Sequence, residues 1–180
     1  MENVFQLRVL VDTQDDKTIF RDIEIKGSQT FLELHHAIQQ AFEFDNSQLA
    51  SFYMSNEDWD KGQEITLMDI PFDDGSVSAS MSATKIGEMV SLVGDKVLYV
   101  FDFMLMWCFY IDVVKILPLE EKAYPICVNS FGDSPNQYSK EVLLDPNDDK
   151  LLLKNKKKGS SSDDSEEDIF DGFDDFDNLV

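Results

Sequence analysis

The feature that most constrains the fold is a change in the period of the apolar side chains within the first 45 residues. Near the N-terminus, alternate residues are apolar, the period of a strand with one covered face: Phe5, Leu7, Val9 and Val11. A second strand-like run, 18–25, follows a polar turn and ends at Gly27, so the two runs predict a β-hairpin. The spacing then becomes helical, so the chain must combine a sheet with a helix.

The predicted helix has a clear start signal. Thr30 can cap its N-terminus and Glu33, three residues on, can complete a capping box. One apolar stripe follows at helical spacing: Phe31, Leu34, His35, Ile38 and Phe42. We expect this helix to end near Glu43 and to pack on one face of a sheet.

The rest of the body predicts further strands and one short helix. Strands are expected at 49–54, 64–68, 96–104, 107–117 and 124–129, a surface loop at 73–82 and a short helix at 85–92. This order predicts an α+β fold, a β-rich sheet with one main helix on a face, and is compatible with a β-grasp-like (ubiquitin-like) layout.

Composition divides the 180 residues into two parts. Residues 1–148 predict one α+β domain with enough apolar side chains for its own core. Residues 149–180 contain a basic cluster, Lys154–Lys158, then a Ser-rich linker and an acidic segment from Asp163 to Val180. We expect this second part to be a disordered acidic tail.

Charge and cysteine usage restrict the partners and the compartment. The net charge of −21 disfavours direct contact with nucleic-acid phosphates and with anionic membranes, and leaves solubility or basic protein partners as explanations. Cys108 and Cys127 both have apolar sequence neighbours and are expected to be buried free thiols, which are typical of a reducing compartment. The N-terminus resembles no secretory signal, so a cytoplasmic location is expected.

The sequence contains no catalytic motif and no metal-ligand spacing, so neither catalytic residues nor a cofactor or metal is expected. Adjacent His35 and His36 point about 100° apart on a helix and cannot chelate one ion together; His35 belongs to the apolar stripe and His36 should face solvent. Trp59 and Trp107 are expected to anchor the core, with ligand binding as the alternative.

Asp102 is the candidate polar site of the body. It lies in the most apolar run of the chain, Tyr99–Phe103, where a carboxylate either faces solvent or is buried and hydrogen-bonded. A turn-capping role is favoured over a catalytic one.

The acidic tail contains a second candidate site. Five large apolar residues alternate there with acidic ones: Ile169, Phe170, Phe173, Phe176 and Leu179. This pattern keeps hydrophobic anchors solvated for a partner's groove, or serves solubility alone; both interpretations stay open.

Three segments carry a resemblance to a known family: 30–35, 55–67 and 98–103. Over about residues 3–145 the chain resembles the plasmid ORF-three-like family, whose members are often labelled insertion-element passenger or "TnpR family" proteins. The resemblance implies a β-rich α+β fold with a ubiquitin-like character and no established activity.

The chain departs from the family pattern after Phe103. Met104–Met106 replaces a Gly-Asp turn, Phe109 stands where the family has a histidine, and the segment Gly132–Tyr138 is also altered. A polar site built on that Asp and His is therefore expected to be dismantled in this chain.

The leading hypothesis is a non-enzymatic module that binds a protein partner through its acidic face or tail. The alternative is an accessory protein of mobile genetic elements that acts on a DNA-binding partner, imitating nucleic acid by its charge. The third is an enzyme of unknown reaction, which would need a pocket joining Asp102, His35 and a cysteine.

Overall fold

The computed structural model describes residues 2–15, 17–68 and 78–140. They lie within one unit, Met1–Leu143. The predicted tail, including Ile169, Phe170, Phe173, Phe176 and Leu179, lies outside the described residues, as does the part of the predicted loop at 73–77.

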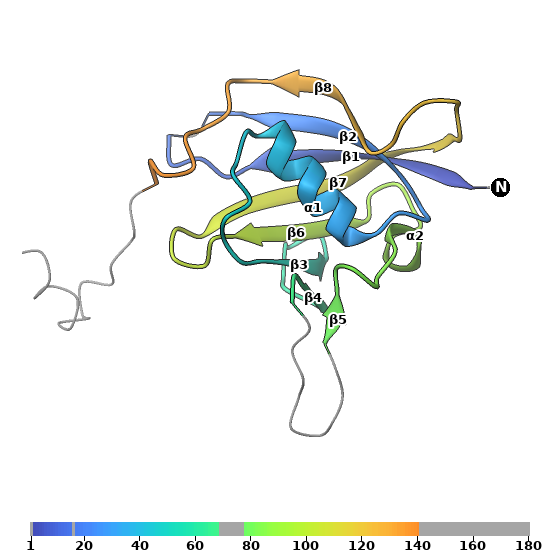
Figure 1. Cartoon of the computed structure of the whole chain (residues 1–180), viewed down its shortest axis with the longest axis horizontal. Helices are drawn as coiled ribbons and strands as arrows, with labels where there is room; N and C mark the ends of the chain where they lie inside the picture. The colour runs from blue at the N-terminus through green and yellow to red at the C-terminus, as the bar shows by residue number, and fades with distance from the viewer. Residues whose placement is uncertain (1, 16, 69–77, 141–180) are drawn as a thin grey trace, which may run out of the picture. The chain divides into compact units, whose positions relative to one another are not determined.

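The described body is built on one eight-stranded sheet (Figure 1). The strands are β1 (Asn3–Val11), β2 (Phe20–Lys26), β3 (Ala50–Ser55), β4 (Glu64–Thr66), β5 (Ala79–Ser80), β6 (Lys96–Phe101), β7 (Trp107–Pro118) and β8 (Ile126–Phe131). Their order across the sheet is β5-β4-β3-β6-β7-β1-β2-β8, and every pair is antiparallel except β4–β5. The predicted α+β class and the β1–β2 hairpin are confirmed.

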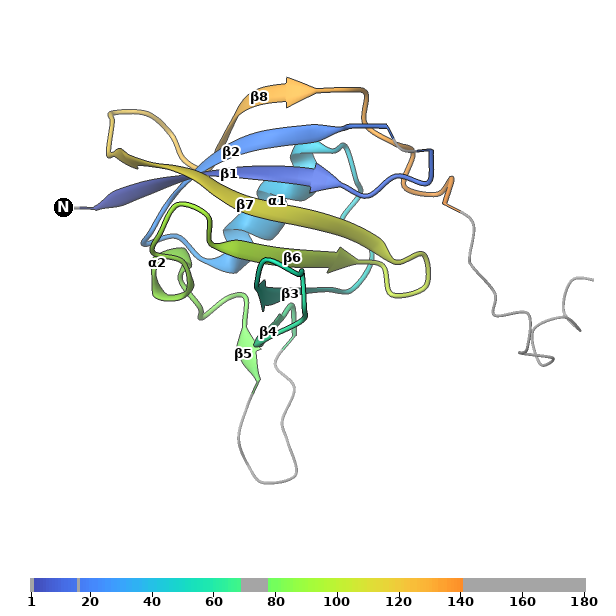
Figure 2. The same ribbon diagram turned by 180° about the vertical axis from the view of Figure 1, so that it is seen from behind.

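Helix α1 (Phe31–Ala41) lies across one face of the sheet, as the two opposite views show (Figures 1 and 2). The predicted capping box is present: the Glu33 amide donates to Thr30 Oγ1 at 3.3 Å, and the Thr30 amide donates to Glu33 Oε2 at 2.7 Å. The helix packs its apolar stripe on aromatic side chains of the strands below; the rings of Phe31 and Phe52, for example, are 5.1 Å apart and edge-to-face. The hydrophobic core therefore lies between α1 and the sheet.

Two sequence predictions need correction. The predicted loop at 73–82 contains strand β5, because Ala79 and Ser80 pair in parallel with Ile65 and Thr66 of β4. A two-residue strand leaves no periodicity to read. The predicted helix at 85–92 is shorter, α2 (Ile86–Met89), and its backbone is tied to the turn between β2 and α1: the Gly87 amide donates to Gly27 O at 2.9 Å.

The face opposite α1 carries a ladder of polar side chains across five neighbouring strands. The register places its members side by side, one per strand: Lys96, Asp112, Arg8, Asp22 and Asn129. Lys96 Nζ lies 2.5 Å from Asp112 Oδ1, and Arg8 donates twice to Asp22, at 2.8 and 2.9 Å. Because each charged residue lies beside a residue of opposite charge on the next strand, these pairs stabilise the observed register of the strands. The ladder ends at β8.

Candidate functional site

Strand β8 is one edge of the sheet, and among the described strands it pairs with β2 alone (Figure 1). All six of its residues are exposed, including Ile126 at 38%, Val128 at 43% and Phe131 at 55%. None of the six is charged. Edge strands usually carry charged residues or proline against unwanted pairing, so a long, uncharged, exposed edge points to a surface that another strand can join.

The β2–β8 ladder contains one irregularity. Asp22 pairs with Asn129 and the next residue, Ile23, pairs with Cys127, so Val128 is an extra residue in β8. Such a bulge leaves the extra residue unpaired and increases the local twist. The edge is thus divided into Ile126–Cys127 and the segment from Asn129 to Phe131.

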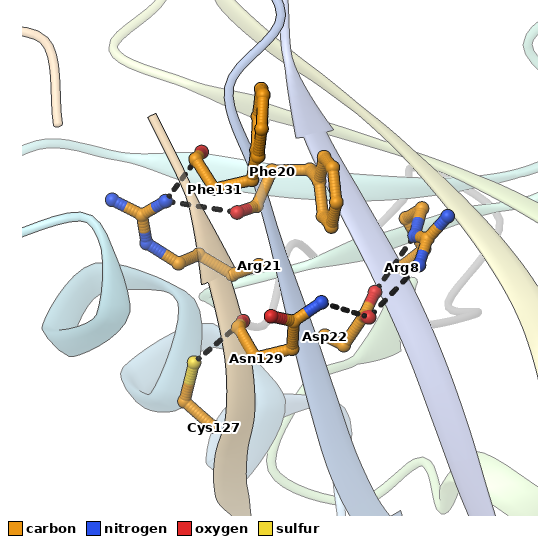
Figure 3. A network of polar contacts seen from close by, with 7 residues as sticks. All are labelled: Arg8, Phe20, Arg21, Asp22, Cys127, Asn129 and Phe131. Atoms are coloured by element: carbon orange, nitrogen blue, oxygen red, sulfur yellow. Dashed lines mark hydrogen bonds and ion pairs between the residues drawn. The ribbon is translucent and has the colours of Figure 1, made fainter. Parts of the chain in front are cut away.

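Asn129 fastens the second segment of β8 to the polar ladder (Figure 3). Its Nδ2 donates to Asp22 Oδ2 at 3.1 Å, while Arg8 holds the same carboxylate from the other side. Burial alone would raise the pKa of Asp22, but the hydrogen bonds from Arg8 and Asn129 outweigh it and leave that pKa below its ordinary value. Asp22 is therefore an anion at neutral pH and a firm anchor for the edge.

Arg21 fastens β8 from the helix side of the sheet. Arg21 is 5% exposed, and its guanidinium donates at 2.8–3.1 Å to five oxygens, the carbonyls of Phe20, Ala41, Phe131 and Gly132 and the hydroxyl of Ser134. It also lies over the ring of Phe42, 4.9 Å from the centroid. The rigid guanidinium thus joins the end of α1, the start of β2 and the end of β8, and it fixes that end of β8. Figure 3 shows its hydrogen bonds to Phe20 and Phe131.

The side chain of Phe131 is held as well, although it is more than half exposed. Its ring stacks on Phe20, with centroids 5.4 Å apart, and Arg8 lies over the Phe20 ring at 4.3 Å. This arrangement presents an ordered aromatic face at the end of the edge strand.

A groove of about 670 Å³ begins where β8 ends. Its walls come from residues 13–15 and 17–19, from Trp107 at the start of β7, and from residues 131–135 with Ser139 and Lys140. Gly132 lets the chain turn into this wall: its φ is +76°, and a Cβ there would lie 3.0 Å from Thr18 O. The groove is a direct continuation of the edge strand, because Phe131 belongs to both.

Four charged residues of the described part of the chain line the groove, and three of them interact with other residues of the protein. Asp15 and Lys17 form an ion pair, and Lys140 donates to Met106 O at 2.5 Å while lying 5.0 Å from the Trp107 ring centroid. Asp133 is exposed and has no hydrogen bond or ion pair with residues 2–15, 17–68 or 78–140. Its carboxylate is therefore the charge that the groove offers to a ligand.

Asp102 does not line this groove. It is 8% exposed, has a φ of +57°, and its Oδ1 accepts from the amides of Met104 and Leu105 at 3.0 and 3.1 Å. The carboxylate thus caps the turn between β6 and β7. That turn leads into Trp107, whose Nε1 donates to Gln137 O at 2.9 Å, so Asp102 positions one wall of the groove from a distance.

His35 of α1 is fully buried and belongs to a separate polar cluster between the helix and the sheet. Its Nδ1 lies 2.7 Å from the Tyr99 hydroxyl, its Nε2 contacts Asn46 Oδ1, and Gln39 Nε2 donates to the same hydroxyl at 2.9 Å. Burial lowers the pKa of His35 to about 4 and raises that of Tyr99. His35 is therefore a neutral part of the core, and His36 faces solvent as predicted.

The two thiols differ from the prediction. Cys108 is partly buried, but Cys127 is exposed on β8, and its Sγ lies 3.4 Å from Asn129 O. The prediction that Cys127 is buried was wrong because its apolar neighbours, Ile126 and Val128, themselves belong to an exposed edge. Trp107 is a core anchor at 3% exposure, whereas Trp59 is partly buried and packs on Tyr110, with ring centroids 4.8 Å apart.

The structure does not join the residues that the enzymatic hypothesis requires. Among the described residues, no hydrogen bond or ion pair links His35, Asp102 and either cysteine. Within the same ranges no group of three or more His, Cys, Asp or Glu side chains is placed to hold a metal ion, and no helix is long and apolar enough to cross a membrane.

Sequence reasoning missed the residues that build the edge and its groove. Arg21 reads as an ordinary polar residue of a strand, and Asp133 as one acid among 36. The uncharged run Ile126–Phe131 was a usable signal, because strands without charges are either covered on both sides or open to pairing.

These features define an α+β protein with one sheet, a helix on one face, and an anchored edge strand that opens into a groove. The chain belongs to the plasmid pRiA4b ORF-3-like family, whose model matches residues 3–142. Among solved structures it is similar to a protein of unknown function, MM3350, from Methanosarcina mazei Go1, with 27% identity over 78% of this chain and 75% of the other and a TM-score of 0.64. No curated protein matches it.

Proposed function

We propose that this protein is a non-catalytic interaction module that binds an extended segment of a partner protein by main-chain pairing along β8. The observation that supports this most strongly is the state of β8, which is exposed along its whole length, uncharged and anchored from both faces of the sheet. An anchored edge loses little conformational entropy when a strand is added, so most of the new hydrogen-bond energy remains available for binding.

Blocking the edge without unfolding the protein tests this proposal. Val128→Lys places a charge on the edge at the one residue that the β2 ladder does not use, and Val128→Pro blocks the edge without adding charge. Leu92→Lys is the matched control, because Leu92 is 66% exposed in the loop before β6. Each variant is used for affinity capture from native lysate, and hydrogen exchange of residues 126–131 is measured in the recovered complex.

We expect a partner that is retained by the wild type and by Leu92→Lys, lost with both Val128 variants, and that slows amide exchange along β8. Equal capture by all four proteins, or unchanged exchange along β8 in the complex, would refute edge pairing.

The mobile-element hypothesis remains the alternative proposal, and it includes the insertion-element passenger role. Residues 1–140 contain 23 acidic and 10 basic side chains, a net charge of −13, which supports attraction to a DNA-binding protein. It predicts that this protein competes with DNA for a basic partner at low salt and that the competition disappears at high salt. Absence of competition at low salt would exclude it.

The cellular location, the β-grasp-like relationship and the role of the tail also remain proposals. A cytoplasmic location is supported by two free thiols. A β-grasp-like relationship is supported by the order hairpin β1–β2, then α1. Partner binding by the tail rests on its acid–aromatic sequence alone.

A further inference from the structure

We propose that the segment bound by β8 is basic, and that one of its lysine or arginine side chains enters the groove beside Asp133 and the Phe131 ring. This inference rests on the proposed edge pairing and adds the chemical class of the partner.

The geometry connects the two surfaces. A strand added beside Asn129–Phe131 continues past Gly132 into the groove, because the same stretch of chain forms the end of the edge and one wall of the groove. In strand addition, main-chain hydrogen bonds supply affinity and the pockets beside the edge supply specificity. The groove would thus bind one side chain of the partner and select for its chemical type.

The chemistry of the groove selects a cation. Asp133 is the one charged residue of its lining that has neither a hydrogen bond nor an ion pair with a described residue, and the exposed Phe131 ring lines the same groove. Trp107, which also lines the groove, has the ammonium of Lys140 5.0 Å from its ring centroid, so an aromatic ring of this groove already contacts a cation. The Asp133 carboxylate together with the exposed Phe131 ring suits lysine or arginine, because the Lys140 ammonium of the same lining is already held by Met106 O and the Trp107 ring.

The field around the site acts in the same direction. The net charge of −13 over residues 1–140 attracts basic partners and repels acidic ones, a second copy of this chain included. β8 itself has no charged residue, so we assign the selection between basic and acidic partner segments to the groove.

The test uses the full-length protein labelled with ¹⁵N and three ten-residue peptides of alternating valine and threonine, in which three threonines are replaced by lysine, glutamine or glutamate. Binding is followed by NMR at the amides of β8 and at the Trp107 indole. Asp133→Asn removes the unpaired carboxylate, and Asp58→Asn is the control of equal charge change, since Asp58 is exposed and does not line the groove.

We expect the lysine peptide to bind about tenfold more tightly than the glutamine peptide at low salt, and the glutamate peptide not to bind. Asp133→Asn should remove most of the difference between the lysine and glutamine peptides and leave the glutamine peptide's affinity unchanged, whereas Asp58→Asn should preserve the difference.

Three results would overturn the inference in distinguishable ways. If all three peptides perturb β8 equally, or if Asp133→Asn has no effect, edge pairing stands and the basic specificity is wrong. If no peptide perturbs β8, the proposed function fails with it. If β8 shifts depend on protein concentration without peptide, the occupant is a second copy of the chain.

Discussion

Acidification from pH 7 to pH 4.5 should destabilise this protein through His35 in particular. The imidazole is fully buried between Tyr99 and Asn46, none of its hydrogen-bond partners is a carboxylate, and burial lowers its pKa from 6.5 to about 4. Between these two pKa values, His35 therefore binds a proton in the unfolded chain but stays neutral in the folded protein. The stabilisation is fully present above the unfolded pKa of about 6.5 and is lost as the pH falls toward 4.

The magnitude follows from the two pKa values. Between pH 7 and pH 4.5 the unfolded form gains stability from protonating His35 and the folded form gains little, a difference of about 2 kcal/mol. This is a large share of the roughly 5–15 kcal/mol by which domains are stable, so urea unfolding at the two pH values can measure it.

The assay compares how much stability each protein loses between the two pH values, because several carboxylates also contribute to acid destabilisation. His35→Gln removes the titrating group and should lose about 2 kcal/mol less than the wild type over this interval. His36→Gln is the matched control, since His36 is the exposed neighbour on the same helix, and it should behave as the wild type. If His35→Gln and the wild type lose the same amount, the buried neutral imidazole is not the acid-sensitive group.

Three further predictions concern β8 and the tail. Asp22→Asn should lower the free energy of unfolding by about 1 kcal/mol in urea titrations at pH 7, because it removes the charge of a buried carboxylate that accepts two hydrogen bonds from the half-exposed Arg8; a loss below about 0.5 kcal/mol would contradict the anchoring role. Arg21→Lys should cost about 2–3 kcal/mol and speed hydrogen exchange at residues 131–134, since an ammonium cannot reach five oxygens; unchanged exchange there would show that Arg21 does not hold this segment. Deleting residues 163–180 should leave capture through β8 intact; loss of the same partner would transfer the binding role to the tail.

Local signals in the sequence were sufficient for the individual elements. The alternation from Phe5 to Val11 predicted β1, and the Thr30–Glu33 pair predicted the start of α1 at the residue where it begins. These predictions succeeded because strand alternation and helix capping are set by residues within a few positions of each other. The same reasoning failed at Ala79–Ser80, where pairing with β4 alone makes a strand.

The sequence by itself determined that a hairpin, a capped helix and further strands form an α+β body with a large negative charge. Only the tertiary structure decided that β8 is an edge, that Arg21 and Asp22 hold it from opposite faces, and that Asp133 lines a groove with no partner among the described residues. The physical reason is distance along the chain: Arg21 and Phe131 are 110 residues apart, and the contact between them exists only once the strand order of the sheet is set. Sequence periodicity reports which face of a strand is covered, but it carries no information on which strand lies beside it.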